Sequence, residues 1–311
     1  MNRTRTAKVA CLTGAGTAPE LMAEGALALD AVARLHGLRI DETHVPFGGV
    51  ALARVGHVVP AGTRTAILDA DAVLVAGAEE TALAEVMREL DIRAQMTRIR
   101  FGPRDDVVLV APFGDADPAW SIERAFETAE SRTVRLAAVG DEAWYEQVDR
   151  LAGAHEHVAV EHLSPRVAVP LAAFSASRFD VVAVAPPWAE TVFEIAAATA
   201  AARVAAHGLL AGHGPSLFMP SPDGGFALAG AGVANPSSML LATALMLDQG
   251  LRWPSPAATL AGAVSAALVD GPQTPDLLQF GVGATSREFT SRVVDGFQLA
   301  HANAEFWQGA A

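Results

Sequence analysis

Short apolar segments that alternate with amphipathic segments constrain the fold of this chain more than any other feature of its sequence. Val107–Ala111 and Val181–Ala185 are apolar throughout, which is typical of strands buried on both faces of a sheet. Segments with apolar residues at helical spacing stand between such strands, as in Glu20–His36. Strands separated by helices predict an α/β fold with a mostly parallel sheet flanked by helices.

The same pattern extends along the whole chain. The predicted strands are Lys8–Leu12, Leu38–Pro46, Ala72–Val75, Val107–Ala111, Val134–Val139, Val158–His162, Val181–Ala185 and Ser216–Met219. The predicted helices are Glu20–His36, Pro60–Ala70, Thr81–Arg93, Ser121–Ser131, Glu142–Leu151, Arg166–Ala176, Ala189–His207, Pro236–Gly250, Ser255–Asp270 and Ser286–Ala304. Gly48 and Gly49 are predicted to form a turn.

Charge and cysteine content exclude several classes of function. The net charge is −13, with 22 Lys and Arg against 35 Asp and Glu, which argues against binding nucleic acid through its phosphates. The single cysteine, Cys11, lies in an apolar run and is predicted to be a buried structural thiol, as expected in the cytoplasm. Met1–Thr6 does not resemble a signal peptide, and the Ala-rich stretch Ile195–Ala206 is interrupted by Arg203, so no membrane span is expected.

Six short motifs, in order along the chain, carry a family resemblance. They are Lys8–Leu21, Pro46–Gly49, Ala70–Leu74, Arg178–Val182, Gly230–Ser237 and Ala242–Leu247. The first resembles the opening strand and glycine loop of isopropylmalate dehydrogenase, and Gly230–Ser237 resembles that enzyme's Gly-Lys-Gly-Ile-Ala-Asn-Pro segment. On these motifs the chain is identified as a strongly diverged member of the isopropylmalate/isocitrate dehydrogenase family, the β-decarboxylating dehydrogenases.

The resemblance implies an isopropylmalate-dehydrogenase-like two-domain fold. Residues 1–97 and 212–311 would form a first, cofactor-side domain, and residues 98–211 a second domain that carries the dimer contacts. It also implies an active-site cleft between the domains and a homodimer whose subunits complete each other's sites. The family's chemistry is oxidation of a 2-hydroxy acid by NAD(P), followed by metal-assisted loss of carbon dioxide, with Mg²⁺ or Mn²⁺ bound by carboxylates.

The family's three arginines that bind the substrate carboxylates have no counterparts here. The resemblance places Met87, Thr97 and Ala111 at their positions. Arg88 and Arg98 stand one residue away from two of these positions and are the candidates for binding a small acid, because a guanidinium pairs with two carboxylate oxygens at once.

The catalytic residues that the resemblance implies are also replaced. Asp141 stands at the position of the family's catalytic lysine, and no tyrosine follows Ala111 in the shortened loop. Glu190 and Glu194 match two metal-binding aspartates, and their i, i+4 spacing puts both on one helix face. Arg166 matches the third metal carboxylate, which the partner subunit supplies. We therefore predict that Arg166 of one subunit pairs with Glu190 and Glu194 of the other, and that no metal binds.

Some residues of the family's cofactor site are matched in this sequence and others are replaced, so NAD binding is left open. Glu80 and Thr81 match a pair near the nicotinamide end, and Asn235 matches an asparagine that contacts the adenine. The segment around Gly225, however, lacks the family's adenine-stacking histidine and ribose-binding aspartate. Asn235 would also persist as a helix N-cap alone. His155, His157 and His162 are not expected to form a zinc site, because no acid or cysteine completes them and His162 points to the other strand face.

Three functions therefore stay open at the level of the sequence. The chain is a diverged protein that acts on a small acid without metal-dependent oxidative decarboxylation, or an NAD-dependent oxidoreductase with altered specificity for 2-hydroxy acids. The third possibility is a non-catalytic subunit that pairs with an active homologue.

Overall fold

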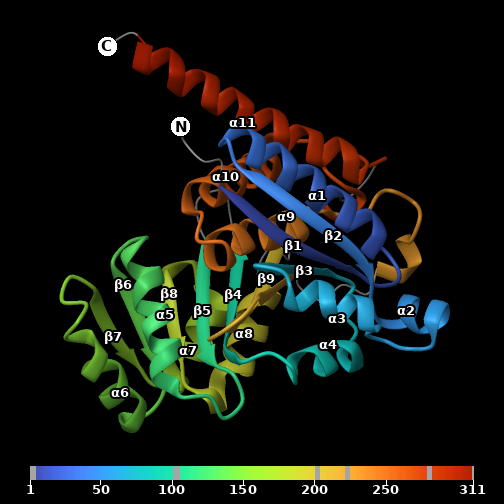
Figure 1. The fold of residues 1–311 in the computed structure, drawn as a ribbon. Coiled ribbons are helices and arrows are strands. Elements are labelled where there is room, and N and C mark those ends of the chain that lie inside the picture. Colours follow the sequence, from blue (N-terminus) through green and yellow to red (C-terminus); the bar gives the residue numbers. More distant parts are fainter. Residues whose placement is uncertain (1–4, 101–105, 200–203, 221–224, 279–281, 310–311) are drawn as a thin grey trace. The chain divides into compact units, whose positions relative to one another are not determined.

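The computed structural model describes residues 5–100, 106–199, 204–220, 225–278 and 282–309, and the chain divides into two compact units (Figure 1). Unit 1 comprises Met1–Leu90 and His213–Ala311, and unit 2 comprises Asp91–Gly212. The domain boundaries expected from the sequence, at residues 97/98 and 211/212, remain a prediction. No helix in the described part of the chain is long and apolar enough to cross a membrane.

Unit 1 contains four parallel strands in the order β2-β1-β3-β10. Their bounds are Thr6–Thr13 for β1, Arg39–Pro46 for β2, Ala72–Ala76 for β3 and Ser216–Pro220 for β10. Every residue of β3 and β10 is buried, as expected for parallel strands covered on both faces. The edge strand β2 alternates between half-buried and exposed residues over most of its length.

Seven α-helices belong to unit 1 among the described residues. They are α1 (Ala18–Leu35), α2 (Gly48–Val55), α3 (Ala61–Leu68), α4 (Glu80–Met87), α9 (Ser237–Leu245), α10 (Pro254–Asp270) and α11 (Ser286–Gly309). Helices α1, α9, α10 and α11 pack against one another. Helix α9 is almost wholly buried and continues into a π-helical turn over Met246–Gly250. The turn predicted at Gly48–Gly49 is wrong, because both glycines open α2.

Unit 2 contains six strands in the order β9-β4-β5-β8-β6-β7. Their bounds are Ile92–Arg100 for β4, Asp106–Pro112 for β5, Arg135–Val139 for β6, Ala159–Leu163 for β7, Val181–Val184 for β8 and Val204–Ala211 for β9. Strands β5, β8, β6 and β7 pair in parallel, whereas β4 runs antiparallel to both β5 and β9. The predicted mostly parallel α/β sheet is confirmed.

Two of the predicted helices extend too far, and both run into the antiparallel strands β4 and β9. The helix predicted over Thr81–Arg93 ends at Met87, and the chain then forms β4. The helix predicted over Ala189–His207 corresponds to α8 (Pro186–Thr199), while Val204–His207 belong to β9. Alanine-rich sequence carries no clear period of two or of 3.6, so pairing with a neighbouring strand decides its structure.

The helices of unit 2 cover the strands from two sides. They are α5 (Pro118–Glu130), α6 (Glu142–Ala152), α7 (Pro165–Phe174) and α8. Helices α7 and α8 pack on each other and bury Ala168, Ala172, Val192 and Phe193 against the apolar side chains of β5, β6 and β8. On α6, the Trp144 indole N–H donates to the Ala183 carbonyl of β8 over 3.2 Å, which fixes this helix on the strands.

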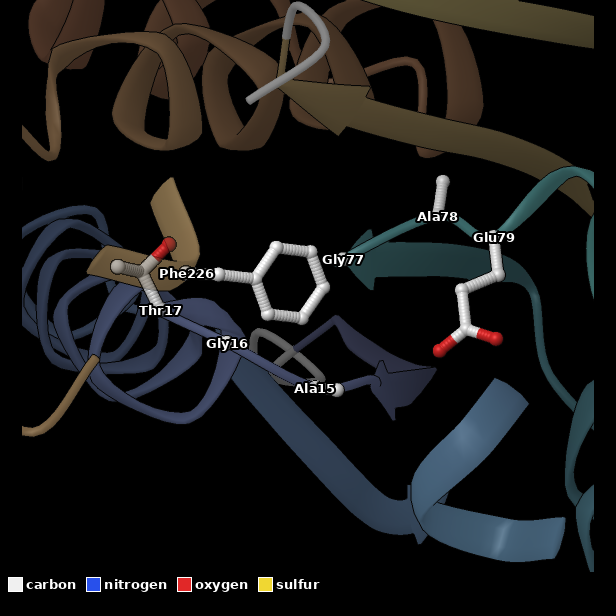
Figure 2. Close-up of a pocket in the computed structure, with 7 residues that line it drawn as sticks. All are labelled: Ala15, Gly16, Thr17, Gly77, Ala78, Glu79 and Phe226. Atoms are coloured by element: carbon white, nitrogen blue, oxygen red, sulfur yellow. The ribbon is translucent and has the colours of Figure 1, made fainter. Parts of the chain in front are cut away.

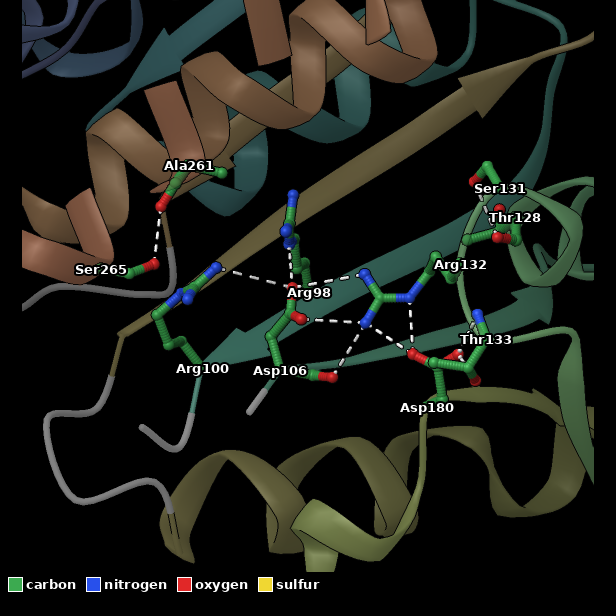
Figure 3. A network of polar contacts seen from close by, with 10 residues as sticks. All are labelled: Arg98, Arg100, Asp106, Thr128, Ser131, Arg132, Thr133, Asp180, Ala261 and Ser265. Atoms are coloured by element: carbon green, nitrogen blue, oxygen red, sulfur yellow. Dashed lines mark hydrogen bonds and ion pairs between the residues drawn. The ribbon is translucent and has the colours of Figure 1, made fainter. Parts of the chain in front are cut away.

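A buried ion network joins strand ends in unit 2 (Figure 3). Asp106 at the start of β5 accepts from Arg98 Nε over 2.5 Å and from Arg132 Nη2 over 2.9 Å, and Arg100 Nη2 lies 3.7 Å away. Arg132 also donates to Asp180 over 2.6 Å. Burial by itself raises the pKa of Asp106, but the charges of Arg98, Arg132 and Arg100 outweigh burial and hold this pKa well below its usual range.

Replacing Asp106 by Asn is expected to destabilise unit 2 by roughly 3 kcal/mol near neutral pH, because it leaves buried arginines without their partner. The folded pKa of Asp106 lies below its unfolded value of about 3.9, so its contribution is present above that pH and is lost as the pH falls. Urea unfolding followed by circular dichroism should therefore show a smaller difference between wild type and Asp106→Asn at about pH 3 than at about pH 7. Asp115→Asn, at an exposed aspartate of the same unit, is the control. An equal loss of unfolding free energy at both pH values would contradict the stabilising role of ionised Asp106.

Candidate functional site

A shallow hollow lies within unit 1, beyond the carboxyl ends of the neighbouring parallel strands β1 and β3 (Figure 2). In open α/β sheets, ligands bind at this edge of the strands. The loop after β1, the turn after β3 and one residue of the short 3₁₀ helix η2 (Gly225–Leu228) line it. The lining residues are Ala15, Gly16, Thr17, Gly77, Ala78, Glu79 and Phe226.

Two glycines allow the floor of this hollow to form. The Gly14 N–H donates to the Ala76 carbonyl over 2.9 Å, which brings the two loops together. A Cβ atom on Gly14 would lie 2.3 Å from the Gly77 carbonyl oxygen, and a Cβ on Gly77 would lie 2.7 Å from Ala18 Cβ. Gly77 also has a φ of +69°, which favours glycine. Neither residue tolerates a side chain, so these glycines are explained by the closeness of the loops.

Phe226 forms one wall of the hollow. Its ring lies beside the Gly16 loop, and a Cβ on Gly16 would lie 3.2 Å from ring atom Cδ1. The segment after η2 is tied to α1, because the Glu20 carboxylate accepts from the Gly230 N–H over 2.6 Å and from the Gly232 N–H over 2.8 Å. Phe226 itself is 67% exposed, so an aromatic face is presented to solvent.

Glu79 supplies the carboxylate among the described residues that line the hollow. It lies immediately before α4, and its Oε1 accepts from the Gly49 N–H over 2.8 Å at the start of α2. A Cβ on Gly48 would lie 2.8 Å from this carboxyl group, so Glu79 explains the Gly48-Gly49 pair. The sequence analysis missed Glu79 and selected Glu80 and Thr81, which are exposed on the first turn of α4. Its position in the loop between a buried strand and a helix is the sequence signal that could have identified Glu79.

The arrangement offers a flat apolar face, a carboxylate acceptor and the N-terminal end of α1, and none of the described residues that line it is a lysine or an arginine. An aromatic face stacks on planar rings, and a carboxylate accepts hydrogen bonds from hydroxyl groups. Backbone N–H groups at a helix N-terminus favour a phosphate or another anion. These three groups match the base, the ribose and the phosphates of a nucleotide. A phosphate bound here would be held by backbone N–H groups alone.

The other residues predicted to bind a cofactor lie around this region of unit 1. Asn235 uses its amide within the chain: its Oδ1 accepts from the Ser237 N–H over 2.9 Å, and its Nδ2 donates to Asp276 over 2.9 Å. It thus helps to begin α9, which is the structural role that the sequence left open for it. Gly225 begins η2, next to Phe226.

The three positions at which the resemblance implies carboxylate-binding arginines, two in unit 2 and one in unit 1, hold no cationic side chain. The Thr97 hydroxyl lies 2.8 Å from His207 Nδ1, on the paired strands β4 and β9. Burial lowers the pKa of His207, so this imidazole is neutral at pH 7. Ala111 is fully buried in β5. Met87, in unit 1, ends α4 and is half-buried.

The two arginines selected for a small acid differ in their surroundings. The Arg98 side chain is 14% exposed and is bound to Asp106, and it points to the opposite face of β4 from Thr97. Arg88 is the C-cap of α4 in unit 1, and its residue is exposed. Of the two, Arg88 has a guanidinium accessible to an incoming anion.

The predicted catalytic residues of unit 2 are spread over three helices. Asp141 caps α6 by accepting from the Trp144 N–H over 3.1 Å. Arg166 on α7 and Glu190 and Glu194 on α8 are all exposed, and none of the described residues forms an ion pair with them. Two carboxylates are suitable oxygen ligands for Mg²⁺. Among the described residues of one chain, however, no histidine, cysteine or further acidic residue lies close enough to act as a third ligand. Whether a metal or a guanidinium completes them depends on the partner residue.

His155, His157 and His162 do not converge on one point. His155 stacks on Phe126 and lies between Glu130 and Glu123, at 2.6 Å and 3.2 Å. His157 reaches the same Glu130 over 3.3 Å. His162 instead pairs with Asp149 over 2.9 Å and stacks on Tyr145. These three histidines are accounted for by carboxylate and ring contacts.

Comparison with known proteins relates this fold and its motifs to one family. Residues 190–293 match the model of isocitrate/isopropylmalate dehydrogenase. The 3-isopropylmalate dehydrogenase of Synechococcus sp. (strain CC9902) is 28% identical over 88% of this chain and 94% of its own length, and that of Lactococcus lactis subsp. lactis (strain IL1403) is 25% identical over 94% and 99%. The chain belongs to the isocitrate/isopropylmalate dehydrogenase family. At these identities it is a strongly diverged member.

Solved structures agree with this family membership at the level of the fold. A β-decarboxylating dehydrogenase from Thermococcus kodakarensis superposes with a TM-score of 0.82 at 20% identity, covering 97% of this chain and 99% of that one. Isocitrate dehydrogenase from Methylococcus capsulatus gives a TM-score of 0.75 at 17% identity, with 94% and 99% covered. The isopropylmalate-dehydrogenase-like α/β fold expected from the sequence is confirmed.

Gly14→Ala is expected to destabilise this family member by several kcal/mol, because the new methyl group would meet backbone atoms that cannot move without separating β1 from β3. Gly62→Ala is the matched control, since nothing lies within 4 Å of its Cβ position in α3; it should stabilise by up to about 1 kcal/mol. Chemical denaturation of both variants measures the difference. A Gly14→Ala variant as stable as wild type would contradict the described approach of the two loops.

Proposed function

We propose that this chain is an isopropylmalate-dehydrogenase-like protein that binds a small carboxylic acid and does not perform metal-dependent oxidative decarboxylation. The observation that carries the proposal is the pairing of Thr97 with His207 where the resemblance implies an arginine. A threonine hydroxyl and a neutral imidazole provide no positive charge, whereas binding of a dicarboxylate relies on charge-assisted hydrogen bonds.

Two further observations support the loss of that chemistry. Ala111 is buried without any exposed surface, so the second arginine position belongs to the core of unit 2. Asp141 is bound to the N-terminus of α6 and stands where the resemblance implies a lysine that donates a proton. A carboxylate that accepts from a helix N–H acts there as a hydrogen-bond acceptor and does not replace the ammonium group of a lysine as a proton donor.

Arg88 is the residue that we assign to the acid. Its guanidinium is accessible, whereas that of Arg98 is engaged by Asp106. With one accessible arginine in place of the three that the resemblance implies, a monocarboxylate or a weakly bound dicarboxylate fits better than isopropylmalate.

The first test combines turnover with binding. Purified protein incubated with NAD, Mg²⁺ or Mn²⁺ and isopropylmalate should form no NADH above the blank. In thermal-shift assays a small carboxylic acid should stabilise the protein, by about 2.7 kcal/mol at a hundred times its Kd, and Arg88→Ala should remove this shift. Arg54→Ala, at an exposed arginine of α2, serves as control. Sustained metal-dependent NADH formation would refute the proposal.

A second candidate function, NAD-dependent oxidation of an altered 2-hydroxy acid, is favoured by the hollow at Gly16. Phe226, in the segment in which the family carries an adenine-stacking histidine at another position, offers a stacking face, and Glu79 offers an acceptor for ribose hydroxyls. When bound, NAD would supply hydride transfer. The residues of this chain would orient its ring and ribose and hold its phosphates at the N-terminus of α1.

Calorimetric titration of NAD distinguishes this second function from the first. If NAD binds here, Phe226→Ala should weaken its affinity by about 1–3 kcal/mol through the lost stacking surface, and Glu79→Gln should weaken it as well. Leu52→Ala, which removes an exposed apolar side chain of α2, should leave the affinity unchanged. Absence of saturable NAD binding in the wild type excludes the oxidoreductase function and leaves the first proposal standing.

We further propose a homodimer built on α7 and α8. Both helices carry exposed apolar side chains: Val167 is 48% exposed, Phe174 90% and Trp188 41%. Arg166 and the pair Glu190 and Glu194 lie exposed on the same two helices, so opposite charges are available to meet across a twofold axis. Exposed apolar residues on packed helices are typical of surfaces that pair with another chain. A catalytic homologue is the alternative partner. We also propose a cytoplasmic location, because the single cysteine, Cys11, is a free and buried thiol.

Arg166→Glu should weaken the dimer at least about tenfold, because it places like charges opposite Glu190 and Glu194. Combining it with Glu190→Arg and Glu194→Arg should restore association. Sedimentation equilibrium gives the dimer constant of each variant, and Arg150→Glu, at an exposed arginine of α6, is the control. A triple variant that stays as weak as Arg166→Glu would contradict the pairing, and a monomeric wild type that associates only with an active homologue would favour the non-catalytic subunit.

A further inference from the structure

Three metal-ligating side chains converge on strands β1 and β2, and none of them lines the hollow at Gly16. Cys11 in β1 is paired in parallel register with His44 in β2, and Val9 is paired with Glu42. Residues that are paired across neighbouring strands, and residues two apart on one strand, point to the same face of a sheet. Cys11, Glu42 and His44 therefore share one face.

Their ligand atoms are close enough to bind one ion. The Cys11 sulfur, a Glu42 carboxylate oxygen and a His44 ring nitrogen all lie within 4.8 Å of one another, and His44 Nε2 is 2.8 Å from Glu42 Oε2. Tetrahedral zinc with ordinary bond lengths separates such atoms by roughly 3.3–3.6 Å. Small side-chain rotations are enough to reach that geometry.

We propose that Cys11, Glu42 and His44 form a binding site for a thiophilic divalent cation, with Zn²⁺ as the preferred ion and water in its fourth position. Thiolate and imidazole select zinc over magnesium or calcium, which prefer oxygen ligands. The thiolate and the carboxylate together carry two negative charges, which a dication neutralises. Cys11 is fully buried while the His44 side chain is 50% exposed, so an ion can enter from the His44 side and remain in contact with solvent.

Without a metal, the cluster is a buried neutral thiol beside a surface His–Glu pair. Burial, and next the charge of Glu42, raise the pKa of Cys11 to about 12, so the thiol keeps its proton at pH 7. Metal binding breaks the S–H bond, forms the metal–sulfur bond and releases one proton to solvent. Affinity must therefore increase with pH.

The site has a structural consequence that does not depend on the proposed function. It joins the edge strand β2 to β1, and β1 carries the Gly14 loop at its carboxyl end. A cation bound to the folded state alone stabilises it by mass action. Zinc would thus stabilise unit 1 without taking part in chemistry at the hollow around Gly16.

The test uses the full-length chain without an affinity tag, treated with a chelator and titrated with Co²⁺. Binding at this cluster should produce one thiolate-to-cobalt charge-transfer band in the near ultraviolet, saturating at one ion per chain and abolished by one equivalent of Zn²⁺. His44→Ala and Glu42→Gln, both at the sheet edge, should weaken or abolish the band, and Cys11→Ser should remove it. His57→Ala, at an exposed histidine outside the cluster, should leave it unchanged.

A second readout does not require the buried cysteine to be replaced. Zn²⁺ should raise the melting temperature of the wild type and of His57→Ala, and should leave that of His44→Ala unchanged. A wild type with no charge-transfer band would overturn the proposal. A band that persists in both His44→Ala and Glu42→Gln would do the same, because Cys11 would then bind cobalt without these ligands.

Discussion

The close approach of the loops that follow β1 and β3 is the contact on which the candidate site depends. It is made by backbone atoms, with the Gly14 N–H bonded to the Ala76 carbonyl and no room for a Cβ at Gly14 or Gly77. Because the two strands are parallel neighbours in register, their carboxyl ends lie at one edge and leave a hollow beyond them. Phe226 and Glu79 then determine its chemical character, through an apolar face and a carboxylate.

The proposed loss of the family's chemistry rests on an electrostatic pattern in unit 2. Two positions that the resemblance assigns to cations hold an uncharged hydroxyl and a core methyl group. Arg98, Arg100 and Arg132 pair instead with Asp106 and Asp180. A buried carboxylate surrounded by guanidinium groups favours its ionised form and holds strand ends together. Arg98, one of the two candidates for binding an acid, thus contributes to the stability of the strands.

Sequence motifs predicted the family and most elements, but they were less informative about individual side chains. Glu80 and Thr81 were selected by alignment to a family motif, yet Glu79 is the residue whose carboxylate reaches the hollow, because it lies in the turn before α4 begins. Similarly, the predicted helices ran into the first residues of β4 and β9, and the rest of both strands was not predicted. Their strand structure follows from mutual antiparallel pairing, a long-range contact that local sequence does not encode.

The sequence by itself determined the α/β class and the order of most strands and helices, and its motifs led to the expectation that uncharged residues stand at the positions that the family uses for its substrate. Periodicity and composition are local properties, so they can be read along the chain. The tertiary structure alone decided which polar atoms have partners: Arg98 is neutralised by Asp106, His207 is buried neutral beside Thr97, and Cys11 lies beside Glu42 and His44. These outcomes depend on strand register and burial, which bring distant residues within bonding distance and change their pKa values.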